Sequence, residues 1–160
     1  MSVAFTKEDS AETAAETMLP DRPISAAANL VTEAGLAALQ AQFDAARLAH
    51  DAASAIDDVN ERRRQAAGPL RDLRYFAERL RTAQLLAHPA TADIVAFGHA
   101  VTYRRDGGKQ ATYRLVGEDE ADPTVGSMSY LAPVAQRLMG KSVGDVVEFG
   151  DAELEILAIA

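Results

Sequence analysis

Cysteine and tryptophan are absent from this 160-residue chain, and long apolar runs are absent too. Without cysteine the chain can form no disulfide, no thiolate zinc site and no cysteine nucleophile. No apolar run approaches the roughly 20 residues that a bilayer-spanning helix needs. The first residues also lack the basic and apolar regions of a secretory signal. We therefore expect a soluble, cytoplasmic protein.

Positive charge is scarce as well. The 16 lysine and arginine residues are outnumbered by 24 aspartate and glutamate residues, so the net charge is −8. This balance argues against tight, sequence-independent binding to duplex DNA, which needs clustered cations against the phosphates. The hydrophobic fraction of 48% is nevertheless high enough to form a core, which excludes wholesale disorder.

The distribution of charge divides the chain into three parts. Residues 1–31 lack a lasting apolar period and contain Pro20-Asp21-Arg22-Pro23, so we expect a disordered or extended N-terminal extension. Residues 32–89 have two halves of opposite sign, with six acidic residues and one arginine up to residue 61, then seven arginines and two acidic residues. Residues 90–160 are acidic and form the third part.

The middle part, 32–89, is predicted to be an antiparallel coiled-coil hairpin. Thr32 is a suitable N-cap, and small or apolar residues follow it at alternating steps of three and four, which is a heptad pattern. Folding the chain near residue 60 would bring two seams together and place the acidic arm beside the basic one. Pro69 would either kink the second helix or begin a new one. The seam positions are Leu36, Leu39, Phe43, Ala46, His50 and Ala53, then Ala66, Leu70, Leu73, Ala77, Leu80 and Gln84.

Residues 90–160 change to a two-residue period, which is typical of strands. Asp106-Gly107-Gly108 is a hairpin turn, and Pro133 is expected to open a short helix that Gly140 closes. The fold class is therefore α+β, with a helical hairpin followed by a small, mostly antiparallel sheet and one short helix. Strands are expected at 99–105, 110–116, 146–149 and 153–158, with a further short strand within 126–131.

Carboxylates gather where the hairpin is expected to bend. Asp57, Asp58 and Glu61 suit a solvated helix end, because acidic residues favour turns and caps. The alternative is that a long arm presents these carboxylates inside a narrow channel, as oxygen ligands for a Mg²⁺ ion held by another protein. The arginines that follow, Arg62 to Arg64, would weaken this negative field or contact phosphates instead.

Other clusters of polar residues carry less information. The acidic residues Glu118, Asp119 and Glu120 follow an expected strand and are interpreted either as a solvated turn or as a contact for a basic partner. The glycine-lysine-serine sequence at 140–142 lacks the first glycine and the open loop of a phosphate-binding motif. The three histidines, His50, His88 and His99, have no metal-ligand spacing.

Four sequence blocks stand out in the C-terminal part. They are Phe97-Gly98-His99-Ala100-Val101-Thr102, Tyr113-Arg114-Leu115-Val116-Gly117-Glu118-Asp119-Glu120-Ala121-Asp122, Ala132-Pro133-Val134-Ala135 with Leu138-Met139-Gly140-Lys141, and Val143-Gly144-Asp145-Val146-Val147. In order and spacing these blocks resemble the C-terminal domain of the Gre transcription elongation factors, GreA and GreB. The resemblance covers residues 30–160; it is strong over 93–148 and weak over 37–76.

The resemblance implies an FKBP-like C-terminal domain that docks on RNA polymerase near its secondary channel, with the hairpin running toward the polymerase active site. The family's tip acids correspond to Asp58 and Glu61, with Asp57 beside them. They would help retain a catalytic Mg²⁺ shared with the polymerase while it cleaves a backtracked transcript. The chain would be a monomer with no cofactor of its own, would not be an enzyme by itself, and would contact nascent RNA and DNA only indirectly. The expected polymerase-binding residues are Ser129, Tyr130, Leu131, Ala132 and Pro133, with Glu118, Asp119 and Glu120.

Departures from the family pattern leave other functions open. The wider tip motif D-L-S-E-N-A-E-Y is absent, arginines follow Glu61, and each arm is shorter than in GreA by roughly two turns of about 3.6 residues. Ala132-Pro133 resembles Rnk, a short-hairpin relative, so the alternative is an Rnk-like regulator that binds RNA polymerase without supporting cleavage. A third hypothesis is an FKBP-like prolyl isomerase or chaperone, which would need an aromatic-lined pocket.

Overall fold

The computed structural model describes residues 18–160, so residues 1–17 of the predicted extension lie outside the described part of the chain. Contacts divide these residues into two compact units. The arm unit contains residues 18–27 and Leu39–Thr82, and the sheet unit contains Ala28–Ala38 and Ala83–Ala160. The long first helix therefore begins in the sheet unit and continues into the arm unit.

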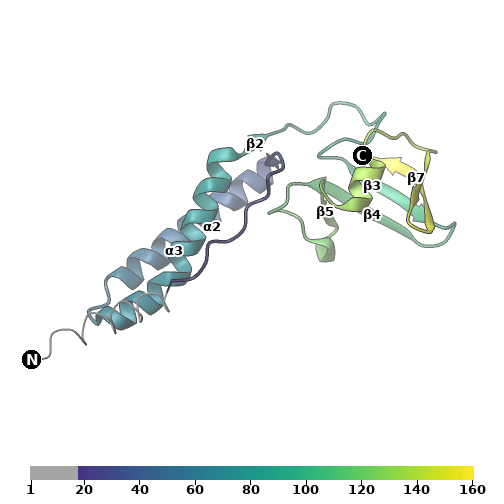
Figure 1. Ribbon diagram of the computed structural model, residues 1–160. Coiled ribbons are helices and arrows are strands. Elements are labelled where there is room, and N and C mark those ends of the chain that lie inside the picture. Colours follow the sequence, from purple (N-terminus) through teal and green to yellow (C-terminus); the bar gives the residue numbers. More distant parts are fainter. Residues whose placement is uncertain (1–17) are drawn as a thin grey trace, which may run out of the picture. The chain divides into compact units, whose positions relative to one another are not determined.

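Two long helices form the predicted hairpin. Helix α2 spans Glu33–Ser54 with 22 residues, and helix α3 spans Val59–Thr82 with 24 residues. At about 1.5 Å per residue they measure about 33 Å and about 36 Å. They lie side by side in Figure 1 and are joined by a turn at residues 55–58, slightly before the predicted bend. The helical hairpin is confirmed.

The predicted seam is correct on α2 and partly wrong on α3. Leu39, Ala46 and Ala53 are at most 9% exposed, and the seam positions between them are half-buried. On α3, in contrast, Leu70 is 37% exposed, and Arg79 is 2% exposed although it is not a seam position. Helix α3 also contacts residues 18–27, since Arg22 stacks on Tyr75 and Asp21 pairs with Arg74.

Pro69 neither ends α3 nor begins a new helix. The helix is continuous from Val59 to Thr82 with Pro69 inside it. Proline has no N–H to donate to the carbonyl one turn earlier, and such a position costs about 3 kcal/mol or more in an isolated helix. Packing within the arm unit must therefore offset this cost.

The sheet unit contains a five-stranded sheet in the order β5-β4-β3-β7-β6. All neighbouring strands are antiparallel except β4 and β5, so the predicted mostly antiparallel sheet is confirmed. The FKBP-like description of this sheet remains a prediction. The elements are β3 (Ala100–Arg105), β4 (Gln110–Val116), a 3-10 helix η1 (Pro123–Val125), β5 (Ser127–Ser129), α4 (Pro133–Leu138), β6 (Val146–Phe149) and β7 (Ala152–Ile159).

The residues of the β3–β4 turn and the alternation of inward- and outward-facing side chains explain why this sheet forms. Asp106 and Gly107 both have positive φ angles, 48° and 68°, as the tight turn between β3 and β4 requires. Inward-facing residues of the strands meet α4 in one buried cluster that forms the core of the unit. Its members are Val95, Val101, Leu115, Ala135, Leu138, Val147, Leu154 and Ile156.

A second, two-stranded sheet was not predicted. Strand β1 (Leu30–Val31) pairs in parallel with β2 (Gln84–Leu85), and the amide of Gln84 donates to the carbonyl of Asn29 at 2.8 Å. Gln84 is therefore an exposed strand residue and not the last position of a helical seam. Within residues 18–160 no helix has both the length and the apolar character needed to cross a membrane.

Candidate functional site

The first predicted tip acid, Asp58, caps helix α3. Its Oδ1 accepts a hydrogen bond from the amide of Glu61 at 2.7 Å, and its carbonyl accepts one from the amide of Arg62 at 2.9 Å. An aspartate in this position satisfies N–H groups that the helix leaves without partners. The Asp58 carboxylate is therefore held at the start of the helix.

The second tip acid, Glu61, is bound to the next turn of the same helix. Its Oε2 accepts a hydrogen bond from Arg64, and its Oε1 accepts one from Gln65 at 2.8 Å. The bond from Arg64, then that from Gln65, lowers the pKa of Glu61 below its ordinary value. Glu61 thus remains ionised and paired in more acidic solution than a free glutamate, and its carboxylate is directed along the shaft of α3.

The third tip acid and the neighbouring arginines complete the bend. Asp57 is exposed and makes no hydrogen bond or ion pair with the residues that the structure describes. Arg62 turns back and donates from Nη1 to the carbonyl of Ile56 at 2.9 Å, which closes the turn. Arg62 and Arg64 are therefore each bound to neighbouring groups of the chain.

These contacts are relevant to the predicted binding of a metal ion at the tip. Mg²⁺ prefers carboxylate oxygens at about 2.0–2.1 Å in a regular octahedron. In the structure the Asp58 and Glu61 carboxylates accept hydrogen bonds from the chain's own donors, so both would have to exchange partners to bind a metal, and their role as metal ligands remains a prediction. Over residues 18–160 no group of three or more histidine or acidic side chains is arranged to hold a metal.

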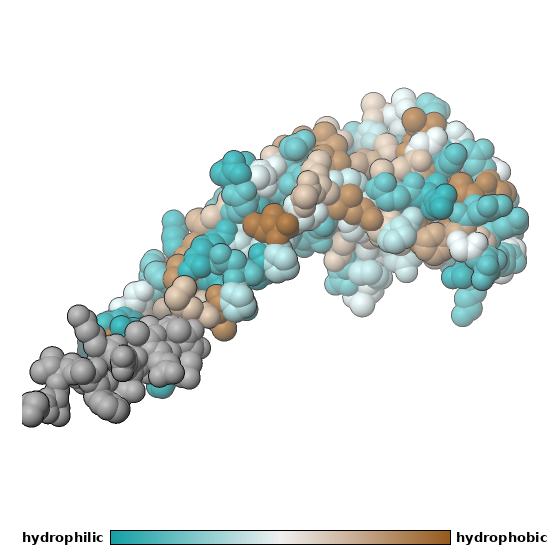
Figure 2. Space-filling view, viewed as in Figure 1, coloured by the Kyte–Doolittle hydropathy of each residue, from teal (hydrophilic) through white to brown (hydrophobic). Residues whose placement is uncertain are grey.

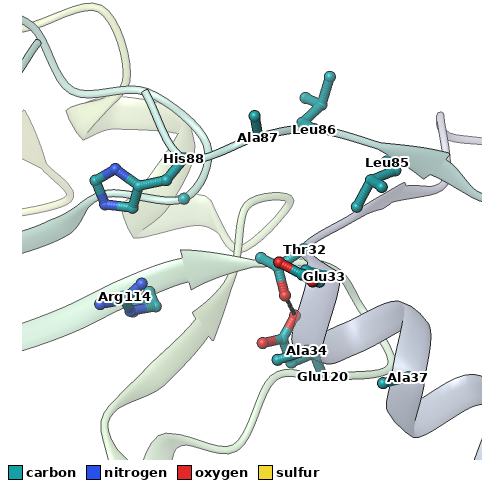
Figure 3. A pocket seen from close by; sticks show the side chains of 11 residues that line it. Thr32, Glu33, Ala34, Ala37, Leu85, Leu86, Ala87, His88, Arg114 and Glu120 are labelled. Atoms are coloured by element: carbon teal, nitrogen blue, oxygen red, sulfur yellow. Dashed lines mark hydrogen bonds between the residues drawn. The ribbon is translucent and has the colours of Figure 1, made fainter. Parts of the chain in front are cut away.

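The predicted contact residue Glu120 lies inside the sheet unit's own structure. Thr32 donates from Oγ1 to Oε2 of Glu120 at 2.6 Å (Figure 3). The same Oγ1 accepts from the amide of Gly35 at 3.0 Å. Thr32 is thus the N-cap of α2, as predicted, and Glu120 supports that cap. A carboxylate near a helix N-terminus is also favoured by the helix dipole.

Tyr130, another predicted contact residue, is buried. It is 7% exposed, its hydroxyl donates to the carbonyl of Ala28, and its ring meets Phe97 edge-on with 5.6 Å between centroids. Its carbonyl accepts from Nε2 of Gln136 at 2.6 Å. Such a residue stabilises the fold, and its role in partner binding remains a prediction.

The remaining predicted contact residues differ in exposure. Pro133 is exposed and begins α4, as expected for a proline in a first turn, and Asp119 is also exposed. The side chains of Ser129, Leu131, Ala132 and Glu118 are half-buried, and Oγ of Ser129 accepts a hydrogen bond from the amide of Leu131 at 3.1 Å. A partner would therefore meet only part of the predicted surface directly.

Gly117 is a residue whose importance sequence reasoning missed. It directly follows β4, and a side chain there would overlap the carbonyl oxygen of Leu30 in β1. The absence of a side chain therefore allows the segment before α2 to lie against the end of β4. No sequence pattern could have indicated this contact, because the two residues are far apart in the chain.

The same region contains a groove of about 980 Å³. Ala34, Ala37, Leu85 and Leu86 form its apolar lining, and Glu33, His88, Arg114 and Glu120 add polar groups (Figure 3). Among the described residues that line it there is no phenylalanine, tyrosine or tryptophan. The groove thus lacks the aromatic lining that the prolyl isomerase hypothesis requires.

Known proteins resemble this chain in sequence. Residues 90–160 match the family described as "Transcription elongation factor, GreA/GreB, C-term". Transcription elongation factor GreA of Desulfovibrio desulfuricans is 35% identical over 105 residues, which cover 62% of this chain and 64% of that protein. Transcription elongation factor GreB of Haemophilus ducreyi is 39% identical over 79 residues, which cover 49% of each. The structure of GreA factor homolog 1 (Gfh1) of Thermus thermophilus has a TM-score of 0.39 and 22% identity, covering 82% of this chain and 97% of that one.

The chain thus spans about half to two thirds of the length of these curated relatives. The blocks from Phe97 to Val147 that carried the resemblance all lie within the matched residues 90–160. Residues 90–160 thus match the C-terminal domain of GreA and GreB, and the chain is similar in sequence to GreA and GreB proteins.

Proposed function

We propose that this protein is a cytoplasmic transcription elongation factor that binds bacterial RNA polymerase at the secondary channel and modulates elongation. Support comes from the match of residues 90–160 to GreA/GreB C-terminal domains and from the two-helix hairpin that precedes them. Contact with nascent RNA and DNA would be indirect, through the polymerase, and the chain would act as a monomer. It would have no catalytic centre of its own.

The contacts of Glu61 favour channel occupancy without transcript cleavage. To act with Asp58 on a Mg²⁺ ion of the polymerase, Glu61 would first have to leave Arg64 and Gln65. Each arm is also only about 33–36 Å long at about 1.5 Å per residue. The protein would therefore regulate RNA polymerase in the manner proposed for an Rnk-like member of the family. The paired state of Glu61 is the observation on which this choice rests.

A transcript-cleavage assay tests the choice. We expect that wild-type protein added to a stalled, backtracked elongation complex leaves the RNA 3′ ends unchanged, and that it inhibits cleavage by an added Gre factor. Both results are expected if the protein occupies the channel but provides no pair of carboxylates to bind the metal. The measurement is the length distribution of labelled RNA over time.

Variants distinguish the two functions in the same assay. If the tip acids assist cleavage, Glu61→Gln lowers the rate by about 10–100-fold, as loss of a group that supports a metal site does. The matched control is Glu78→Gln, because Glu78 binds Arg81 in α3 with the same three-residue spacing but lies far from the bend. RNA shortening that is lost in Glu61→Gln and kept in Glu78→Gln would contradict channel occupancy without cleavage.

A further inference from the structure

Residues 18–23 lie along helix α3 within the arm unit. The guanidinium of Arg22 is 3.8 Å from the ring centroid of Tyr75, and its Nη1 is 3.4 Å from Oδ1 of Asp72. The preceding residue, Asp21, forms an ion pair with Arg74 at 2.7 Å. The two charged residues of the segment, Asp21 and Arg22, thus each face a residue of opposite charge on α3.

The contacts continue toward the bend of the hairpin. Met18 and Leu19 line a depression of about 280 Å³ together with Ala66 and Leu70 of α3. Because Met18 lies beside residues 66–70 while Arg22 meets residue 75, the segment runs parallel to α3. It is the dark purple stretch that follows the helices in Figure 1.

The sequence of the segment suits side-chain contact without backbone pairing. Pro20 and Pro23 fix two φ angles and provide no N–H groups, so the segment stays extended at little entropic cost. In the described part of the chain no backbone–backbone hydrogen bond joins residues 18–23 to α3. The segment is therefore held by side chains alone.

The contacts between residues 18–23 and α3 are weak enough to break reversibly. Asp21 and Arg74 are 67% and 48% exposed in their side chains, and exposed ion pairs are weak and screened by salt. A cation over an aromatic ring at an exposed site is also a modest interaction. Open and closed forms of such a segment can therefore both be populated, and their ratio depends on ionic strength.

The closed segment covers a surface of mixed character. Arg63, Ala66, Leu70 and Arg74 form a basic and apolar strip on α3, which Met18 and Leu19 partly cover. Leu70 remains 37% exposed, and the arm in Figure 2 shows hydrophilic residues interspersed with small apolar patches. Release of the segment would expose this strip in full.

We propose that residues 18–23 are a releasable strap that closes on α3 of its own chain, with Arg22 as the latch. Closed, the strap covers the strip from Arg63 to Arg74; rising ionic strength opens it. Its basic and apolar side chains suit an extended segment that carries apolar and acidic side chains. We assign the strip to residues 18–21 of this same chain, which have that composition. The strap does not depend on the polymerase-binding function proposed above.

Solution NMR of the full chain tests the strap. At low salt we expect the δ protons of Arg22 to be shifted upfield by the Tyr75 ring, and nuclear Overhauser effects to connect the Met18 methyl with Leu70. Arg22→Ala removes both the stacking and the Asp72 contact, and should lower the closed-to-open ratio by about tenfold, which weakens the Met18–Leu70 effects. One molar salt should reduce the Arg22 shift.

Two controls keep the test specific. Arg47→Ala removes an arginine of α2 that pairs with Asp44 three residues before it, so it should leave the Met18–Leu70 effects unchanged. Circular dichroism establishes that Arg22→Ala keeps its helices. Unshifted Arg22 protons at low salt, or Met18–Leu70 effects that survive Arg22→Ala, would overturn the proposal. Effects that depend on protein concentration would also overturn it, because the strap would then bind a second copy.

Discussion

Replacing Gly117 with alanine is expected to destabilise the sheet unit by about 1–3 kcal/mol, the usual cost of forcing extra atoms into a packed site. The added methyl group would overlap the carbonyl oxygen of Leu30, which belongs to the backbone and can move only if β1 moves. Denaturant unfolding gives the free energy. Hydrogen exchange of the Gln84 and Leu86 amides, which donate to carbonyls of residues 29 and 31, should become faster.

Gly108→Ala is the matched control for this prediction. Like Gly117 it has no positive φ, and a side chain there would make only an ordinary contact of 3.4 Å with the carbonyl of Arg105. Its unfolding free energy should change little. If Gly117→Ala unfolds like the wild type and the two amides stay protected, the close approach of β1 to the end of β4 is not required by the fold.

Tyr130→Ala is expected to cost about 3–5 kcal/mol, as other truncations of large buried aromatic residues do. The ring packs against Phe97, and the hydroxyl donates to the carbonyl of Ala28. Tyr130→Phe keeps the ring and should cost only about 0.5–1.5 kcal/mol, the net value of one hydrogen bond. Thermal and denaturant unfolding measure both differences.

This comparison separates a structural role from a partner-binding role. If Tyr130 served only to contact a partner, Tyr130→Ala would keep the stability of the wild type and lose only binding. The structure predicts the reverse order, with stability lost first. Pro133, which is exposed, is the residue of the same predicted surface whose substitution can change binding without unfolding.

The sheet was largely predictable because its signals are local. The alternating residues at 110–116 and 146–149 became β4 and β6 with the predicted bounds, and the turn Asp106-Gly107 forms as its chemistry requires. The α2 seam was predictable for the same reason, since a heptad repeats every few residues. In each case the residues that decide the structure are close together in the chain.

The parts that could not be predicted depend on distant contacts. Strands β1 and β2 have two residues each and pair with each other although more than fifty residues separate them in the chain. Two residues are too few to show an alternating strand pattern. Glycine is needed at position 117 only because Leu30 lies against it, and Arg22 can stack only because Tyr75 lies next to it.

The tip shows how one spacing can serve two purposes. An acid at position 58 and another three residues later is the spacing of a helix N-cap and the third helical residue. Asp58 fills the first role, while Glu61 turns toward Arg64 and Gln65. The sequence alone could not distinguish capping from metal binding, because both use carboxylates at this interval.

Competition for RNA polymerase tests the central claim most directly. A fluorescently labelled Gre factor is bound to a stalled elongation complex, and the unlabelled full chain is added in increasing amounts. The account predicts that the chain displaces the labelled factor, because both would occupy the secondary channel. Failure to displace it at any concentration, or binding to the polymerase alongside it, would contradict the account.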